Sequence, residues 1–290
     1  MKKFKLGEFE RNSAIVFAVS MLANVVTYLY QIVMGNLLSP ADYGTINTLL
    51  SLSIVIGVPS GIISTLVATY TAKYQAVGKP ELIGGFMHKM LRASVLLACV
   101  VFAAGAALSS IIANVLQIEE TRYILATMVV VAFSCVAPVF SCTLQGVKRF
   151  VPYSINGVLN IAIRLLLSIP FVRMGFGIGG NLAAVILAAF ATAAFCFWCA
   201  RDLFFAPKIE QLHLDRTEIR RYFVSTFWFQ LFLLLMANGD VLLIKTFAAD
   251  PAEVGIYSSG SVIGKISLYL ANAIVPVLLP MVAERQSTGH

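Results

Sequence analysis

Two cations lie deep inside apolar segments of this chain, and their positions call for a chemical explanation. Arg164 and Lys265 each stand about ten or more residues from either end of a segment long enough to cross a membrane. Burying such a charge costs about 2.5 kcal/mol or more on insertion scales, so each cation needs a partner or a hydrated cavity. The pattern favours a cavity lined with positive charge. A structural ion pair is the alternative, with Asp240 as the available counter-ion, and Lys245 is expected to snorkel from the end of its segment.

Uncharged polar residues recur at helical spacing in three of these segments. In hydrocarbon such a side chain needs a hydrogen-bond partner or water, so a polar stripe marks the inward face of a helix. The stripes are Ser20, Asn24, Thr27, Tyr28 and Gln31 in the first segment, Tyr153, Asn156, Asn160, Arg164 and Ser168 in the fifth, and Ser258, Ser261, Lys265, Tyr269 and Asn272 in the eighth. The candidates for binding a substrate are Arg164, Lys265, Asn24, Gln31, Asn156, Asn160 and Asn272. For any one Asn, Ser or Thr, a hydrogen bond between helices is the alternative.

The elements that must position these residues are membrane helices. With 59% hydrophobic and 12% charged residues, the chain carries about half the charge of an ordinary soluble domain. Segments that can span a membrane lie at 13–38, 43–73, 90–116, 122–146, 152–173, 177–203, 222–248 and 253–283. The sequence therefore predicts an all-α integral membrane protein with eight transmembrane helices.

The distribution of charge predicts the topology. Most of the 21 lysines and arginines fall on the side of the N-terminus, and only Arg122, Arg173 and Lys245 fall near the other side. The positive-inside rule then places both termini in the cytoplasm. The net charge of +7 is explained by these loops, and no basic cluster interleaved with aromatic residues indicates a nucleic-acid partner.

Patterns typical of enzymes have simpler explanations here. The segment 175–180 contains GxGxxG but follows a membrane helix, so it predicts a turn rather than a nucleotide site. The segment 57–61 places two glycines around Pro59 and predicts close packing with a kink. The five cysteines lie in apolar segments, which favours buried thiols over disulfides. No metal-ligand spacing or catalytic triad is evident, so we expect no enzyme, metal or cofactor.

One short pattern occurs twice in the same sense. Residues 40–44 read Pro-Ala-Asp-Tyr-Gly and residues 251–255 read Pro-Ala-Glu-Val-Gly, each between two apolar segments. In both, proline can begin a helix and the acid lies near its positive N-terminus. The recurrence predicts a duplicated unit whose copies are related by an axis normal to the membrane.

Several segments resemble one transporter family. They are 38–44, 144–146, 175–180, 240–243 and 253–257, and together they look like the polysaccharide-transporter branch of the multidrug/oligosaccharidyl-lipid/polysaccharide exporter superfamily. The resemblance covers essentially the whole chain. It implies two six-helix bundles about a pseudo-twofold axis, with a cavity that opens alternately to each side. The implied substrate is a short oligosaccharide on undecaprenyl pyrophosphate, as handled by O-antigen and capsule-unit flippases.

On this basis we expect a flippase of the bacterial inner membrane. Its divisions are a six-helix bundle at 1–203, a cytoplasmic connection at 204–221 and the first two helices of a second, incomplete bundle at 222–290. Arg164 and Lys265 would meet the pyrophosphate, and Asp240 is a candidate for a coupling-ion site because Asn238 and Gly239 beside it could let the helix unwind. Membrane lipids, a glycan polymerase and glycosyltransferases are the further expected partners. The alternatives are a cation-coupled drug or metabolite exporter of the same superfamily and a non-transporting membrane scaffold for glycan assembly.

Overall fold

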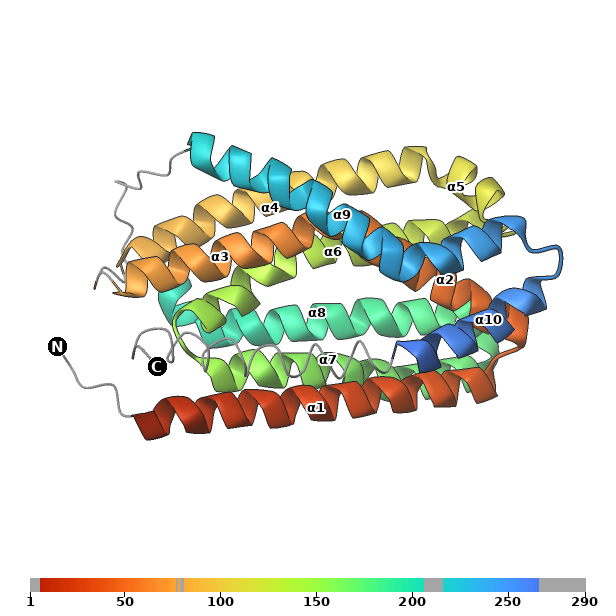
Figure 1. Ribbon diagram of the computed structural model, residues 1–290, viewed down its shortest axis with the longest axis horizontal. Helices are drawn as coiled ribbons and strands as arrows, with labels where there is room; N and C mark the ends of the chain where they lie inside the picture. Colours follow the sequence, from red (N-terminus) through yellow and green to blue (C-terminus); the bar gives the residue numbers. More distant parts are fainter. Residues whose placement is uncertain (1–5, 77, 79–80, 206–215, 266–290) are drawn as a thin grey trace, which may run out of the picture.

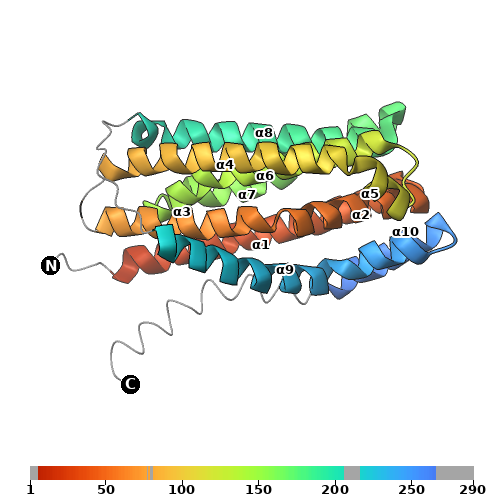
Figure 2. The ribbon, with the colours of Figure 1, turned by 90° about the horizontal axis from the view of Figure 1, so that it is seen from above.

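The chain forms a bundle of long helices that lie side by side along its longest axis (Figure 1, Figure 2). The computed structural model describes residues 6–76, 78, 81–205 and 216–265, and no β-strand occurs in these ranges. The elements are α1 (Leu6–Leu37), α2 (Pro40–Ile56), α3 (Val58–Ala76), α4 (Glu81–Ala107), α5 (Ser109–Val115), α6 (Thr121–Gly146), α7 (Phe150–Phe171), the π-helical turn η1 (Val172–Phe176), α8 (Gly177–Phe204), α9 (Arg216–Phe247) and α10 (Pro251–Gly264). The predicted all-α class is confirmed.

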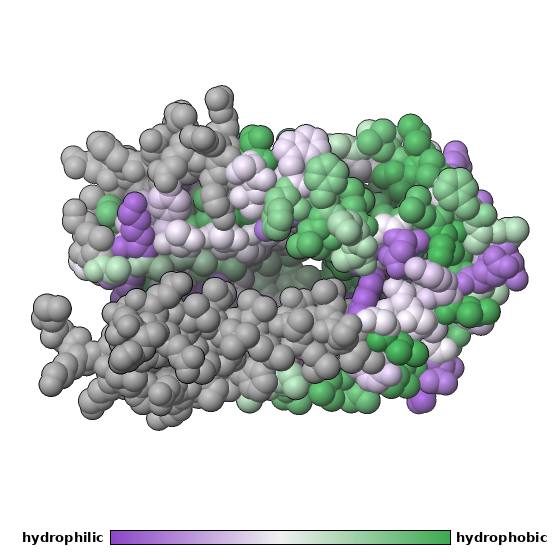
Figure 3. All heavy atoms as spheres, viewed as in Figure 1, coloured by the Kyte–Doolittle hydropathy of each residue, from purple (hydrophilic) through white to green (hydrophobic). Residues whose placement is uncertain are grey.

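The helices have the length and composition of membrane spans. Five described stretches qualify, or six if α2 and α3 count as one bent span, with 150–204 counted as a single stretch. Large exposed side chains along α9 are hydrophobic, among them Phe232, Met236 and Phe247, and the described surface in Figure 3 is largely hydrophobic toward one end. The chain is therefore a multi-pass membrane protein. The eighth predicted span, 253–283, is described only as far as residue 265.

The two ends of the bundle differ in charge. We call the end that holds Lys73, Lys148 and Arg201 the basic end, and the end that holds the α1–α2 and α9–α10 connections the turn end. At the basic end Arg149 forms an ion pair with Asp202, in which Nη1 donates to Oδ1 at 2.9 Å. These hydrogen bonds raise the pKa of the Arg149 guanidinium above its usual value. The pair ties the start of α7 to the end of α8.

Two predicted irregularities in the helices are confirmed. The chain bends by 50° between α2 and α3, at Gly57, two residues before a proline that cannot donate a backbone hydrogen bond. The chain reverses between α7 and α8 through Gly175, whose φ is +90°, and Gly177, whose φ is +48°. Both values lie in the region that glycine adopts readily, so the glycine-rich segment is a turn between antiparallel helices.

The duplicated pattern forms the contact between α2 and α10 at the turn end. Ser39 caps α2 by accepting a hydrogen bond from the Asp42 amide, and Asp250 caps α10 by accepting one from the Ala252 amide. A methyl group at Gly44 would lie 2.7 Å from the Gly255 nitrogen. Residues equivalent under a twofold rotation meet only near its axis, so this contact supports the predicted relation between the two copies.

α6 lies at the centre of the bundle and packs on α3, α4 and α8. Its Met128, Cys135 and Leu144 are fully buried. α9 packs mainly on α2 and α3. The predicted division of the chain falls between the end of α8 at Phe204 and the start of α9 at Arg216, and its exact boundaries stay a prediction.

Candidate functional site

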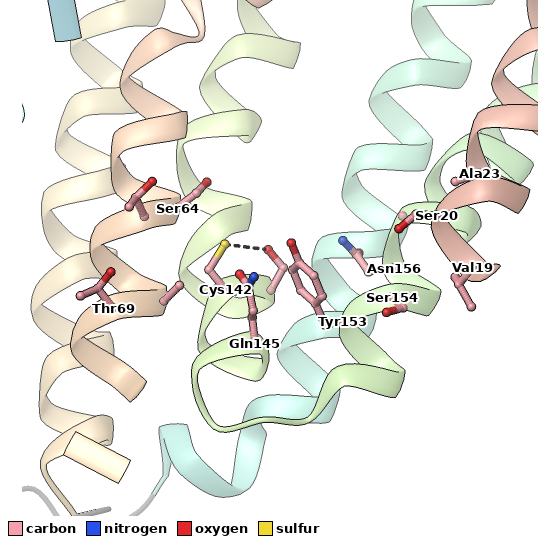
Figure 4. A pocket seen from close by; sticks show the side chains of 14 residues that line it. Val19, Ser20, Ala23, Ser64, Thr69, Cys142, Gln145, Tyr153, Ser154 and Asn156 are labelled. Atoms are coloured by element: carbon pink, nitrogen blue, oxygen red, sulfur yellow. Dashed lines mark hydrogen bonds between the residues drawn. The ribbon is translucent and has the colours of Figure 1, made fainter. Parts of the chain in front are cut away.

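A polar pocket lies between four helices near the basic end. It has a volume of about 530 Å³, and Figure 4 shows α3 and α6 on one side of it and α7 and α1 on the other. Its polar lining consists of Ser20, Ser64, Thr65, Thr69, Ser141, Cys142, Gln145, Tyr153, Ser154 and Asn156. Gln145 stands at the end of α6 and Tyr153 at the start of α7, so the pocket reaches the basic end.

The described lining of the polar pocket is uncharged. None of the described lining residues is Lys, Arg, Asp or Glu. The Ser154 hydroxyl is buried and has no hydrogen-bond partner among the described residues. A buried polar group without a partner costs about 1–3 kcal/mol. The pocket can therefore satisfy hydroxyl and amide groups of a ligand, and one of its own groups would gain from such a ligand.

Arg164 lies two turns deeper on α7, in a network with α1 and α8. Its Cζ is 4.1 Å from the centre of the Tyr30 ring, and its Nη2 donates to the Tyr30 hydroxyl at 2.8 Å. The Asn181 amide donates to the same hydroxyl at 2.7 Å. The Arg164 Nε is buried with no partner among the described residues. An aromatic ring and a hydroxyl hold this cation, and the alternative of an ion pair with Asp240 is wrong for this conformation.

The polar stripe of α7 does not face one cavity. Tyr153 and Asn156 line the polar pocket, whereas Asn160 donates to Thr192 of α8 at 3.2 Å. Ser168 accepts a hydrogen bond from α8 as well. Each four-residue step over-rotates a helix by about 40°, so the stripe winds about 120° between Asn156 and Ser168. Its basic-end part faces the pocket, and its deeper part joins helices.

The second deep cation belongs to a cluster between α9 and α10. The Lys265 Nζ donates to Oδ1 of the buried Asn238 at 3.4 Å. Nearby, Asp240 Oδ2 accepts hydrogen bonds from Tyr257 at 3.0 Å and Ser261 at 3.2 Å, while its Oδ1 is buried without a partner among the described residues. Lys265 contacts Asn238 of α9 and Arg164 contacts Tyr30 of α1, so the two deep cations have different described partners. α9 is continuous through Gly239, so the predicted unwinding is absent here.

The prediction that Lys245 snorkels is wrong. This residue is 4% exposed, and its Nζ donates to the Thr45 hydroxyl at 3.3 Å. The physical reason is the packing of α2 on α9, which encloses the end of α9. Next to it, Gln117 donates to the Thr246 carbonyl at 3.1 Å. These contacts fasten α9 to the rest of the bundle at the turn end.

Two of the remaining candidates fall outside the described lining of the pocket. Gln31 accepts a hydrogen bond from Tyr43 at 3.0 Å and so joins α1 to α2, and Asn24 is half-buried beside the lining residue Ala23. Asn272 lies outside the described residues. The sequence interpretation missed the wall formed by α3 and α6, although Ser141 and Gln145 stand four residues apart. It also missed Tyr30 and Asn181, because a lone polar residue in an apolar segment gives no periodic signal.

Comparison with solved structures defines the class of protein. The fold resembles a multidrug resistance MATE family transporter of the MOP superfamily in an inward-facing conformation, with a TM-score of 0.60 and 15% identity over 90% of this chain and 59% of that one. It resembles MATE in complex with Br-NRF, with a TM-score of 0.68 and 16% identity over 92% and 64%. It also resembles a MOP superfamily transporter from Pyrococcus furiosus, with a TM-score of 0.62 and 17% identity over 92% and 61%; the reverse polarity of the binding pocket in that transporter suggests a different function for it.

The chain is thus a multi-pass membrane protein with a MATE-like fold, and it spans about three fifths of the length of these structures. Residues 9–286 match the family described as polysaccharide biosynthesis protein, and the chain belongs to that family. No curated protein matches the sequence. The resemblance seen in the sequence is confirmed.

Proposed function

We propose that the protein acts in moving a lipid-linked oligosaccharide of the undecaprenyl-pyrophosphate type across the bacterial inner membrane. The observation that carries the proposal is the polar stripe of α7, whose basic-end part lines an uncharged polar pocket and whose deeper part, two turns further on, holds the cation Arg164. Sugar hydroxyls match the first region and phosphate oxygens match the second. Membership of a polysaccharide biosynthesis family and a transporter fold supports a transporter rather than an enzyme.

The two ends of the bundle suggest which side admits the substrate. The contact of Gly44 with Gly255 closes α2 against α10 at the turn end, while the polar pocket reaches the basic end. With the basic end in the cytoplasm, the sugar head would enter from that side as the lipid tail stays in the membrane. Arg164 Nε has no acceptor among the described residues, and because it is buried an acceptor reaches it only after α1 shifts against α7.

Translocation of the headgroup tests this function. Proteoliposomes that contain the protein and a fluorescent lipid-linked oligosaccharide are treated with a membrane-impermeant reagent that oxidises the sugar. We expect the protected inner-leaflet fraction to fall with time only where the protein is present. An unchanged fraction, with correctly folded protein in the vesicles, would leave the scaffold for glycan assembly as the better explanation.

Asp240 is the proposed site of cation coupling. One of its carboxylate oxygens is buried without a partner among the described residues, and Tyr257 and Ser261 bring two further oxygen atoms to the other. An intramembrane acid that lacks a described counter-ion is a natural site for a proton or a metal cation. A coupling cation suits the drug exporter alternative equally, so this cluster does not separate the two. Headgroup translocation that loses its dependence on an imposed ion gradient in Asp240→Asn would support the assignment.

A further inference from the structure

We propose that the polar pocket binds uncharged saccharide units and excludes acidic ones, an inference that rests on the proposed function and names its substrate class. The pocket offers hydroxyl and amide groups from two facing walls, which come from α3 and α6 on one side and from α1 and α7 on the other (Figure 4). Such groups both donate and accept, as sugar hydroxyls do. Its volume of about 530 Å³ lies within the usual range of small-molecule sites.

One hydroxyl of the pocket wall lacks a hydrogen-bond partner among the described residues. Ser154 is 9% exposed, and its Oγ has no hydrogen-bond partner among the described residues. Because Oγ is buried, a sugar hydroxyl would satisfy it only after neighbouring side chains shift to admit the ligand. The neighbouring Tyr153 and Asn156 supply an aromatic ring with a phenol and a carboxamide, which extend the hydrogen-bonding surface without adding charge.

We expect acidic sugars to be excluded because no cation is among the described residues that line the pocket. A uronic acid carboxylate in this pocket would lose its hydration without gaining an opposite charge, which is costly. Arg164 lies eight residues beyond Asn156, about 12 Å along the helix, with its guanidinium against Tyr30. Lys73, one turn beyond Thr69 on α3, is exposed, and its Nζ lies 5.9 Å from the centre of the Tyr70 ring. Neither cation lines the pocket.

A native thiol reports occupancy. Cys142 lines the pocket, so a variant that keeps Cys142 and has the other four cysteines replaced can be alkylated with N-ethylmaleimide in lipid nanodiscs. We expect maltotriose, an uncharged trisaccharide, to slow alkylation several-fold and trigalacturonic acid to leave the rate unchanged. A matched variant that keeps only Cys99, exposed on α4, should respond to neither. If Cys142 itself reacts too slowly, Ser64→Cys in a cysteine-free background is the second reporter.

Two substitutions test the chemistry of the site. Thr69→Lys places a cation in the pocket and should make trigalacturonic acid protective. Asn156→Ala should weaken protection by maltotriose several-fold, whereas Asn36→Ala, on exposed surface of α1, should not.

Each outcome decides the proposal. Equal protection by both trisaccharides would overturn the exclusion of acidic sugars, and protection by neither would remove the pocket as a saccharide site. Because protection measures binding alone, intact protection without headgroup translocation would overturn only the proposed flippase function.

Discussion

At the scale of single residues, two roles for Arg164 can be distinguished: binding a phosphate of the substrate, or bracing α7 against α1. Its stacking on Tyr30 is a cation–π contact, worth about 0.5–2 kcal/mol, and its Nε has no acceptor among the described residues. If the guanidinium binds a phosphate, Arg164→Lys keeps the charge but loses the forked geometry, so transport should fall partially. Arg164→Gln should reduce transport about tenfold to hundredfold, as expected for a lost hydrogen bond to a charged group. Headgroup translocation per folded molecule is the measurement.

The structural alternative for Arg164 makes a different forecast. If the residue only braces α7 against α1, Arg164→Gln lowers the amount of folded protein in the membrane, while the surviving molecules translocate at the normal rate. Tyr30→Phe is the matched control, since it removes the hydroxyl and keeps the ring. A normal rate of headgroup translocation per folded molecule in Arg164→Gln would show that Arg164 does not bind the substrate.

A second residue-scale prediction concerns the buried ammonium of Lys245. The Thr45 hydroxyl is its hydrogen-bond partner among the described residues, so Thr45→Val should lower the free energy of unfolding by about 1–3 kcal/mol. Thr48 provides the control, because its hydroxyl donates to the Gly44 carbonyl of its own helix. Thr48→Val should therefore cost less. Thermal unfolding in detergent measures both.

The background of Lys245→Met isolates the contact. With no ammonium to satisfy, the extra cost of Thr45→Val over Thr48→Val should vanish. An equal difference in both backgrounds would mean that Thr45 stabilises α2 independently of Lys245.

At the scale of elements, the contact of α2 with α10 depends on the absence of two side chains. A Cβ at Gly255 would lie 1.9 Å from the Pro40 carbonyl oxygen, so Gly255→Ala must push the helices apart. We expect the turn end to open and stability to fall by about 1–3 kcal/mol, as for overpacking. Gly260 lies on the same helix, and a Cβ there would meet no described atom within 4 Å, so Gly260→Ala should be neutral or slightly stabilising. Distances between spin labels on the two helices measure the opening.

Gly255→Ala and Gly260→Ala can be compared directly, because each variant adds one methyl group to α10. Unchanged label distances in Gly255→Ala would show that α10 shifts locally and that the contact does not hold the turn end closed. Wider distances in Gly260→Ala would show that the effect is unrelated to the crossing.

The elements themselves could be predicted from sequence better than their contacts could. Apolar length locates most of the helices, and Pro59 and the glycines at 175 and 177 mark the bend and the reversal. Which face of a helix meets which neighbour depends on rotation and tilt, which periodicity alone does not give. For this reason the polar stripe of α7 divides between the pocket and α8. The prediction that Lys245 snorkels is wrong because the helix that encloses it, α2, comes from a distant part of the sequence.

At the scale of the whole molecule, the two copies of the turn share structural features beyond their identical residues. Ser39 and Asp250 are different residues, yet each caps its helix, and α1 and α9 are both 32 residues long. A comparison of residue identities does not detect the shared caps, because a hydroxyl and a carboxylate can each accept the hydrogen bond at a helix N-terminus. The copies run in the same sense in Figure 1, with α1 and α9 both leading toward the turn end.

This arrangement makes the orientation of the molecule testable at two positions. Positive charge at the basic end predicts that this end faces the cytoplasm and the turn end faces outward. In a cysteine-free background, an impermeant thiol reagent applied to spheroplasts should therefore label Ala249→Cys, at the exposed α9–α10 turn, and spare Glu81→Cys, at the exposed start of α4. Permeabilised membranes, in which both positions should react, control for accessibility. Labelling of Glu81→Cys in intact spheroplasts, with Ala249→Cys reacting only after permeabilisation, would invert the molecule and put the polar pocket on the outer side.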